Sequence, residues 1–362
     1  MPFLGSLPRY ALIGMLALCS GCDQSPRQKL LDREHLVFLC QPPAAKTPIP
    51  AELASNASLV DVIIPMWFDI KSDGSIVSIH KDSDYAAYRE FCQKNGITLL
   101  PILRNFKPKD FLLDSKAISR AVVELGALLK REGFDGFTVD IEEDSTDDRT
   151  HRPMLSFLEQ AYAEVKKQDK FLCVTFNPVY WGRGWQNKEI FEHCDWAFSM
   201  FYDYAGPWNK TRVTATAPYE WPSQSRDLKR DIEKIISEQS AGKIIFGIPA
   251  YGNDCAFDAE GNCVEMTVSY VNSFLALKAL ENAPKLWDAE ARTPYFEYQR
   301  DGKRHRVWYE DAESYQWRTE LATKLKCAGI GVWSVGSKDG MDPALWASIK
   351  NYRQDHACTQ AP

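Results

Sequence analysis

The sequence lacks the short motifs that are typical of proteins that bind a metal, a nucleotide or a nucleic acid. Beyond Cys22 it contains no C-x-x-C pair, and its 6 histidines are scattered without zinc-site spacing. It has no Walker-type phosphate loop, internal repeat or low-complexity tract. A formal net charge of −6 argues against nucleic acid as a partner. The residues therefore indicate no metal, no cofactor and no nucleic-acid partner.

Long apolar runs are also scarce. The clearest one, Tyr10–Leu18, is too short to cross a membrane and fits a signal peptide over residues 1–21. The segment before Cys22 resembles a bacterial lipobox, which implies a lipid anchor on Cys22 and a polar tether over residues 22–33. Asp23 resembles a signal for retention in the inner membrane. The alternative is an ordinary secretory signal and a secreted protein.

Export permits disulfide bonds among the remaining cysteines. Cys255 and Cys263 lie close together in a polar loop and form the best candidate pair. Cys40 and Cys173 sit in apolar strands, so we expect buried thiols there. The pairing of the other cysteines is left open.

Apolar strand-like runs alternate with helix-compatible segments, which predicts a parallel sheet built from βα units. Eight such strands predict a (β/α)8 barrel, the TIM-barrel fold, over residues 34–356. The expected strands are 35–41, one within 59–70, 97–105, 137–141, 171–176, 196–202, 243–249 and 329–335.

The connection between the seventh and eighth strands is too long for a simple loop. It contains a helical segment, Val271–Leu280, and two aromatic strands, Tyr295–Tyr298 and Arg306–Tyr309. Asp301-Gly302 between these strands is a hairpin signal. We therefore expect a small α+β insertion over residues 253–309.

The fourth strand carries the acids around which the chain is organised. It lies in Gly133–Asp144, which reads GFDGFTVDIEED. Because strand side chains alternate between two faces, Thr138, Asp140 and Glu142 share one face. Buried acids are costly, so a plain core strand would not contain them. An acidic loop that caps the next helix is the alternative.

The full string resembles the D-G-x-D-x-D-x-E signature of glycoside hydrolase family 18, the chitinase-like family. Asp135, Gly136, Asp140 and Glu142 match, whereas Thr138 replaces the usual middle acid. Three later segments also resemble motifs of this family, in the expected order: Met200–Tyr204, Phe246–Gly252 and Gly331–Ser334.

The resemblance implies hydrolysis assisted by the substrate's own acetamido group, with no metal or cofactor. Glu142 would be the general acid and base, Asp140 would support the acetamide N–H, and Tyr202 would donate to the acetamide oxygen. The residues expected to contact substrate are Asp203, Trp333, Asn177, Trp67 and Thr138.

The substrate implied is a glycan with β-linked N-acetylglucosamine. The third strand, with Pro101–Asn105, together with Pro65–Phe68, is more similar to the cell-wall and spore-wall N-acetylglucosaminidase branch. A lipid-anchored protein of the bacterial envelope that faces the periplasm would fit chitooligosaccharides, peptidoglycan or a related polysaccharide. The alternative from another functional class is a catalytically silent, lectin-like family member that only binds glycans.

Overall fold

The structure is a computed structural model that describes residues 24–41, 49–79, 82–141, 148–177, 187–209, 211–223, 226–238, 241–335 and 341–357. Within these ranges, no helix is both long enough and apolar enough to cross a membrane. Cys22 and Glu142 lie outside the described residues.

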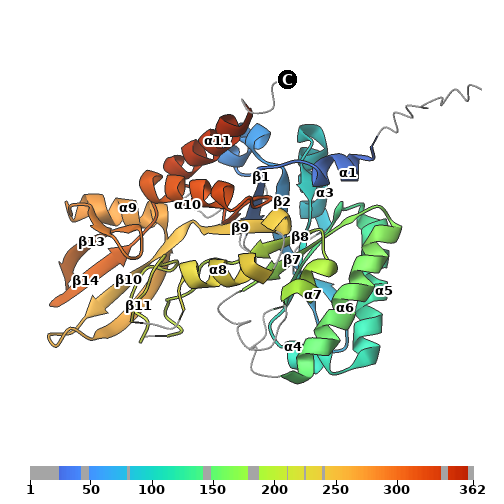
Figure 1. The fold of residues 1–362 in the computed structure, drawn as a ribbon, viewed down its shortest axis with the longest axis horizontal. Coiled ribbons are helices and arrows are strands. Elements are labelled where there is room, and N and C mark those ends of the chain that lie inside the picture. The colour runs from blue at the N-terminus through green and yellow to red at the C-terminus, as the bar shows by residue number, and fades with distance from the viewer. Residues whose placement is uncertain are drawn as a thin grey trace, which may run out of the picture.

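Eight parallel strands form one closed sheet (Figure 1). β1 pairs with β15 on one side and with β2 on the other, so the sheet closes in the order β1-β15-β9-β8-β7-β6-β5-β2. This arrangement confirms the predicted (β/α)8 barrel. The barrel strands are β1 (Leu36–Gln41), β2 (Val62–Ile70), β5 (Ile102–Asn105), β6 (Gly136–Ile141), β7 (Phe171–Phe176), β8 (Trp196–Ser199), β9 (Ile244–Pro249) and β15 (Gly329–Trp333).

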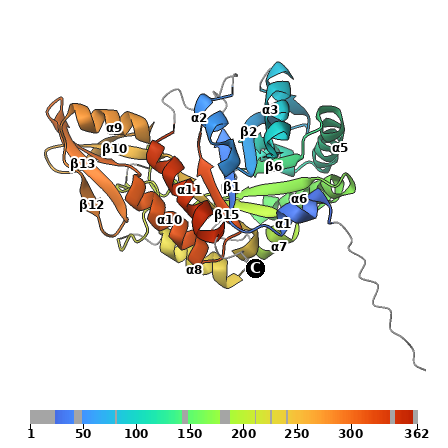
Figure 2. The same cartoon turned by 90° about the horizontal axis from the view of Figure 1, so that it is seen from above.

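Helices follow the strands and surround the barrel, and α10 and α11 pack side by side between the barrel and the second sheet (Figure 2). The larger helices are α3 (Asp82–Asn95), α5 (Ser115–Glu132), α6 (Asp148–Lys167), α8 (Leu228–Glu238), α10 (Ala312–Lys324) and α11 (Pro343–Ala357). The shorter ones are α1 (Pro26–Leu31), α2 (Ala51–Ser55), α4 (Pro108–Leu112), α7 (Asn187–Glu192) and the 3-10 turns Ala57–Leu59 and Ala241–Lys243.

The strands divide the apolar core into two layers because their side chains alternate. On β1, Phe38 and Cys40 point into the barrel, whereas Val37 and Leu39 pack outward against the helices. The interior is therefore filled with side chains, and only the inward residues near the strand ends can reach a site there.

Three predicted barrel strands are shorter than the sequence suggested, and the eighth ends at Trp333 rather than Val335. The third is divided into β4 (Thr98–Leu99) and β5, because Pro101 has no N–H to contribute to the sheet. The sixth ends at Ser199 rather than Tyr202, and the chain then turns through Asp203, whose φ is 66°. A short strand, β3 (Ile76–Ser78), adds to β2 in the antiparallel direction.

The insertion forms a second sheet beside the barrel, of five antiparallel strands covered by α9 (Val271–Leu280) (Figure 1). The predicted hairpin is present as β13 and β14, with Asp301 and Gly302 both in left-handed conformations at its turn. The strands are β10 (Tyr251–Phe257), β11 (Cys263–Tyr270), β12 (Leu286–Asp288), β13 (Thr293–Arg300) and β14 (Lys303–Trp308).

The predicted disulfide between Cys255 and Cys263 is present. Its surroundings differ from the expected polar loop, because Cys255 lies within β10 and Cys263 begins β11. The predicted thiols of Cys40 and Cys173 are also confirmed as free and buried.

Part of the range predicted as a tether is the helix α1, which lies against the amino ends of the barrel strands. Ser25 caps the helix and Pro26 occupies its first turn, so its start is well specified. Leu30 is buried, and the Arg27 guanidinium pairs with the carboxylate of Asp195. These contacts hold the segment to the barrel.

Gly136 begins β6 in a conformation that other residues rarely adopt, with a φ of 155°. A Cβ atom at this position would lie 2.0 Å from the backbone oxygen of Phe171 on β7. The glycine of the signature therefore lets these two barrel strands approach, and so places the acid that follows on β6.

We predict that Gly136→Ala lowers the free energy of unfolding by about 3 kcal/mol or more, because strain and backbone overlap add together. Urea unfolding followed by circular dichroism measures the change. Gly126→Ala on α5 is the matched control, since its Cβ would meet mainly the flexible side chain of Glu164. An equal, small change in both variants would contradict this role for Gly136.

Candidate active site

A cavity of about 220 Å³ lies at the carboxyl ends of the barrel strands. Four residues singled out in the sequence line it together: Asp140, Tyr202, Asp203 and Trp333. They come from β6, the segment after β8, and the end of β15. In barrels of this fold, the carboxyl ends of the strands are the face that carries catalytic residues.

Asp140 is a buried carboxyl group held by a neighbouring strand. The Thr175 hydroxyl on β7 donates a hydrogen bond of 2.5 Å to Asp140 Oδ1. Burial raises the pKa of Asp140, while the Thr175 hydrogen bond and the positive charge of Arg104 act against that increase. The net result is a raised pKa, so the contacts with Thr175 and Arg104 offset only part of the effect of burial.

Thr138 takes no part in this contact. It is fully buried two residues before Asp140, and its hydroxyl donates to the backbone oxygen of Leu100 at 3.2 Å. It does not line the cavity. Its expected contact with substrate is therefore not supported by its position, because it points into the layer of side chains below the cavity floor.

Tyr202 and Asp203 form one wall with a tyrosine from the second sheet. Tyr251, at the start of β10, donates a hydrogen bond of 2.5 Å to Asp203 Oδ1 and packs edge-on against Tyr202. The Asp203 backbone N–H donates to Thr216 Oγ1 at 3.2 Å. Burial raises the pKa of Asp203 to about 6, although the bonds to Tyr251 and Thr216 oppose it.

Trp333 and Asp203 also border a wider cavity of about 580 Å³ towards the second sheet. Trp208, which is 51% exposed, lies on its rim, and Tyr270 on β11 contributes another aromatic ring. The peptide bond between Trp333 and Ser334 is cis. The two cavities share Asp203 and Trp333 and are therefore neighbours. Aromatic side chains thus line the space from Asp140 out to the second sheet.

Two expected contact residues lie elsewhere. Trp67 is buried between the barrel and its helices, where it packs against Tyr85 and Tyr88. The reason is strand alternation, because its neighbour Met66 takes the inward position on β2 and lines the cavity. Asn177 is buried directly after β7 and is not among the residues that line the cavity.

Several residues of the site were not expected from the sequence. Thr175 is a polar residue within an apolar strand and shares the inward face of β7 with Cys173, so alternation could have identified it. Tyr251 was present in a recognised motif but received no role. Arg104 lies on β5 and Phe106 directly follows it, and no local pattern gave either residue a role in the site.

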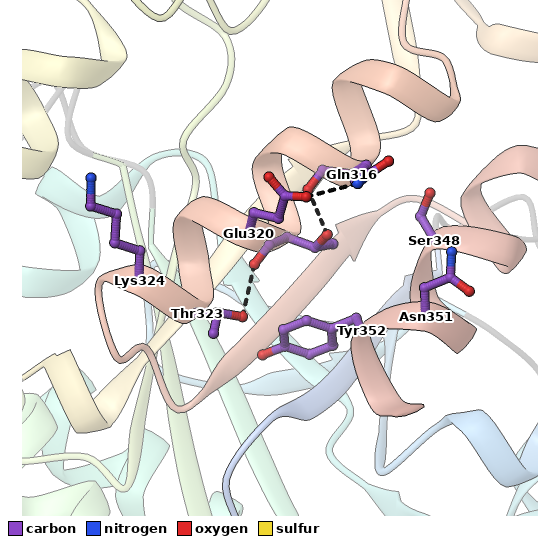
Figure 3. A pocket seen from close by; sticks show the side chains of 8 residues that line it. Gln316, Glu320, Thr323, Lys324, Ser348, Asn351 and Tyr352 are labelled. Atoms are coloured by element: carbon purple, nitrogen blue, oxygen red, sulfur yellow. Dashed lines mark hydrogen bonds between the residues drawn. The ribbon is translucent and has the colours of Figure 1, made fainter. Parts of the chain in front are cut away.

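Another cavity, of about 350 Å³, lies between α10 and α11, outside the barrel (Figure 3). Its side chains are mostly polar, and Gln316 donates to Glu320 at 2.8 Å within it. Asn351 and Tyr352 line it from α11. It holds none of the residues that surround Asp140, and we assign it no catalytic part.

The fold and this site together define a class of protein. A barrel with two carboxyl groups, a tyrosine and a tryptophan around one cavity at its carboxyl face is suited to the hydrolysis of glycosidic bonds. The family comparison then makes the assignment particular: residues 44–339 match the model of "Glycosyl hydrolases family 18". The chain belongs to this family of glycosidases, as the signature around Asp140 predicted.

Curated relatives agree with this assignment at low identity. The chain is 26% identical over 225 residues to YdhD of Bacillus subtilis (strain 168), named provisionally as a sporulation-specific glycosylase, with 60% of this chain and 50% of that protein covered. The match thus spans about half the length of that relative. Mouse di-N-acetylchitobiase is 24% identical over 257 residues, which cover 62% of this chain and 69% of that protein.

Among solved structures, a chitinase from Chromobacterium violaceum superposes with a TM-score of 0.74 at 20% identity. The superposition covers 88% of this chain and 99% of that chain. At this identity the likeness establishes the shared fold.

We predict that Asp203 makes stability depend on pH. Its pKa of about 6 in the folded protein lies above the ordinary 3.8, so the folded state holds a proton that the unfolded chain releases first. Stability should therefore fall as the pH rises from about 4 to 6, by roughly 2–3 kcal/mol relative to Asp203→Asn. Urea unfolding at several pH values between 4 and 7 measures this difference.

Glu159→Gln, an exposed substitution on α6, is the control and should follow the wild-type curve. Parallel curves for wild type and Asp203→Asn would show that the carboxyl group of Asp203 keeps its ordinary pKa.

Proposed function

We propose that this protein hydrolyses β-linked N-acetylglucosamine glycans with retention of configuration, by substrate-assisted catalysis. The observation that carries the proposal is the cavity that brings together Asp140, Tyr202, Asp203 and Trp333. Family membership supports the glycan class, and the name of the chitobiase relative agrees with it.

In the first step, Glu142 gives its carboxyl proton to the oxygen of the leaving sugar. The acetamido oxygen of the substrate attacks the anomeric carbon as the glycosidic bond breaks, which leaves an oxazolinium ion. In the second step, the Glu142 carboxylate takes a proton from water, and the water oxygen opens the ring of that ion. Two inversions at the anomeric carbon give net retention.

In this proposal, Asp140 stabilises both the protonated form of Glu142 and the positive charge of the intermediate. An anionic carboxylate near Glu142 raises the pKa of Glu142 and keeps it protonated as a general acid. The same carboxylate accepts a hydrogen bond from the acetamide N–H and supports the positive charge that develops there. Thr175 and Arg104 favour the charged state that both roles require.

Thr138 limits where a proton can be held in the site. A second acid at this position could share a proton with Asp140, but a threonine cannot take up charge. The Thr138 hydroxyl donates to the backbone oxygen of Leu100, whereas the Thr175 hydroxyl donates to Asp140. We therefore assign Asp140 a fixed role as an anion through the cycle.

The aromatic residues supply the surface on which sugar rings lie. Trp333 stands between the catalytic cavity and the wider one, and Trp208 is half exposed at the rim of the latter. Flat apolar rings with a polar edge suit the faces of pyranose sugars. The proposed Tyr202 donation to the acetamide oxygen would orient the sugar next to the scissile bond.

A position in the bacterial envelope belongs to the same proposal. The lipid anchor at Cys22 and the signal peptide before it lie outside the described residues. Both remain predictions from the sequence. The choice between an anchored and a secreted protein depends on them.

We predict that Glu142→Gln lowers the hydrolysis rate by at least about 10²-fold, because the amide cannot deliver a proton. The measurement is sugar release from chitooligosaccharides and from peptidoglycan by protein that begins at Asp23. Proton NMR of the first product should show the β-anomer before mutarotation.

Glu143→Gln, which changes the next acid of the same stretch, is the matched control and should keep most of the activity. Equal losses in the two variants would remove Glu142 from its assigned role. An α-anomer as the first product would exclude the retaining mechanism.

A further inference from the structure

A fourth cavity adjoins the catalytic one on the side away from the second sheet. It encloses about 350 Å³, within the range of about 300–1,000 Å³ that is common for ligand pockets. Phe106, which is 59% exposed, lines both this cavity and the catalytic one, so the two are neighbours. The charged residues that line it are Asp69, Lys71, Arg104, Lys107 and Asp110.

These groups give the cavity an excess of positive charge. Three cations and two acids leave a net charge of +1, in a protein whose formal net charge is −6. Asp69 lies between two of the cations, with 2.6 Å to Arg104 Nε and 3.1 Å to Lys71 Nζ. Its negative charge is therefore already matched by both, and Lys107 adds a charge that has no ion pair among the described residues.

Arg104 is held in place and still has a donor to offer. Its Nε donates to Asp69, its Nη1 lies 2.8 Å from Met66 Sδ, and the guanidinium lies over the ring of Phe106 at 4.8 Å. Its Nη2 donates to no acceptor among the described residues. A fixed guanidinium with a remaining N–H is well suited to a carboxylate.

The cavity also has a fixed position relative to Asp140. Arg104 on β5 is the direct strand partner of Asp140 on β6. The turn that carries Phe106 and Lys107 is fixed by Asn105, whose Oδ1 accepts from the Lys107 backbone N–H at 2.7 Å. A sugar chain bound across Asp140 would thus bring the substituents of a neighbouring residue to the cationic side chains.

We propose that this cavity binds a carboxylate carried by the glycan, so that the preferred substrate is an anionic polymer. In such a polymer, N-acetylglucosamine alternates with a sugar that bears an acidic substituent, in contrast to neutral chitin. This inference rests on the proposed glycosidase function and narrows its substrate. Arg104 and Lys107 are its specificity-determining residues.

The test compares two oligosaccharides of equal length. In one, N-acetylglucosamine alternates with N-acetylmuramic acid, and in the other the same carboxyl groups are reduced to alcohols. The measured quantity is the ratio of kcat/KM for the acidic substrate to kcat/KM for the reduced one. Wild type should prefer the acidic substrate about tenfold or more, as one charge-assisted hydrogen bond allows, and the preference should decline with added salt.

Arg104→Gln should lower that ratio about tenfold, and Lys107→Gln should lower it by a smaller factor. Lys94→Gln removes a positive charge from the last turn of α3 and should leave the ratio unchanged. If Arg104→Gln does not fold, the exposed Lys107 still tests the inference.

The outcomes separate this inference from the proposed function. Hydrolysis of both substrates at equal rates, with a ratio unaffected by either variant, would overturn the anionic preference and leave the glycosidase intact. Hydrolysis of neither would overturn the proposed function on these substrates. Calorimetric binding of the two oligosaccharides to wild type then decides the inference: tighter binding of the acidic one supports it, and equal affinity overturns it.

Discussion

The hydrogen bond from Thr175 to Asp140 is the contact on which the site depends. A carboxyl group taken out of water loses its hydration, and burial alone drives it towards the neutral form. One short bond from β7 and one cation on β5 oppose that tendency from the two neighbouring strands. The charge state of Asp140 is thus a property of three adjacent barrel strands and of the register between them.

The second sheet completes the site from the other side. β10 begins with Tyr251 directly after β9, so the connection is too short to let the sheet move far from the barrel. Tyr251 bonds to Asp203 and packs against Tyr202, which joins the sheet to the wall of the catalytic cavity. The buried ion pair of Arg318 and Glu310 further fixes the chain where it returns from the sheet to α10. The insertion therefore supports the wall of the catalytic cavity and lines the wider cavity beside it.

The barrel could be predicted from the sequence because its strands are apolar and alternate with helical segments. Alternation along β6 also placed Asp140 correctly towards the interior. The same rule, applied to β2, directs Trp67 outward. The expected substrate contact of Trp67 came from the family resemblance, which did not take account of the face of the strand on which the residue lies. Pro101 breaks the predicted strand 97–105 into β4 and β5, a division that was not predicted from the sequence although proline disfavours a central strand.

Other features could not be obtained from the sequence. β10 and β11 contain polar residues and a disulfide, so they read as a loop, and only their pairing in space makes them strands. Thr175 and Arg104 act on Asp140 across strands, and contacts between strands depend on register that no local pattern specifies. Glu142 lies outside the described residues, so its role rests on the signature alone.

The most direct test of this account is the pH dependence of kcat/KM for Thr175→Val beside Thr175→Ser. Loss of the hydroxyl should raise the pKa of Asp140, so the acidic limb of the profile should move to higher pH in the valine variant, with a lower maximum. The serine variant keeps the donor and should retain the wild-type profile. Identical profiles in all three proteins would contradict the claim that the Thr175 hydroxyl lowers the pKa of Asp140.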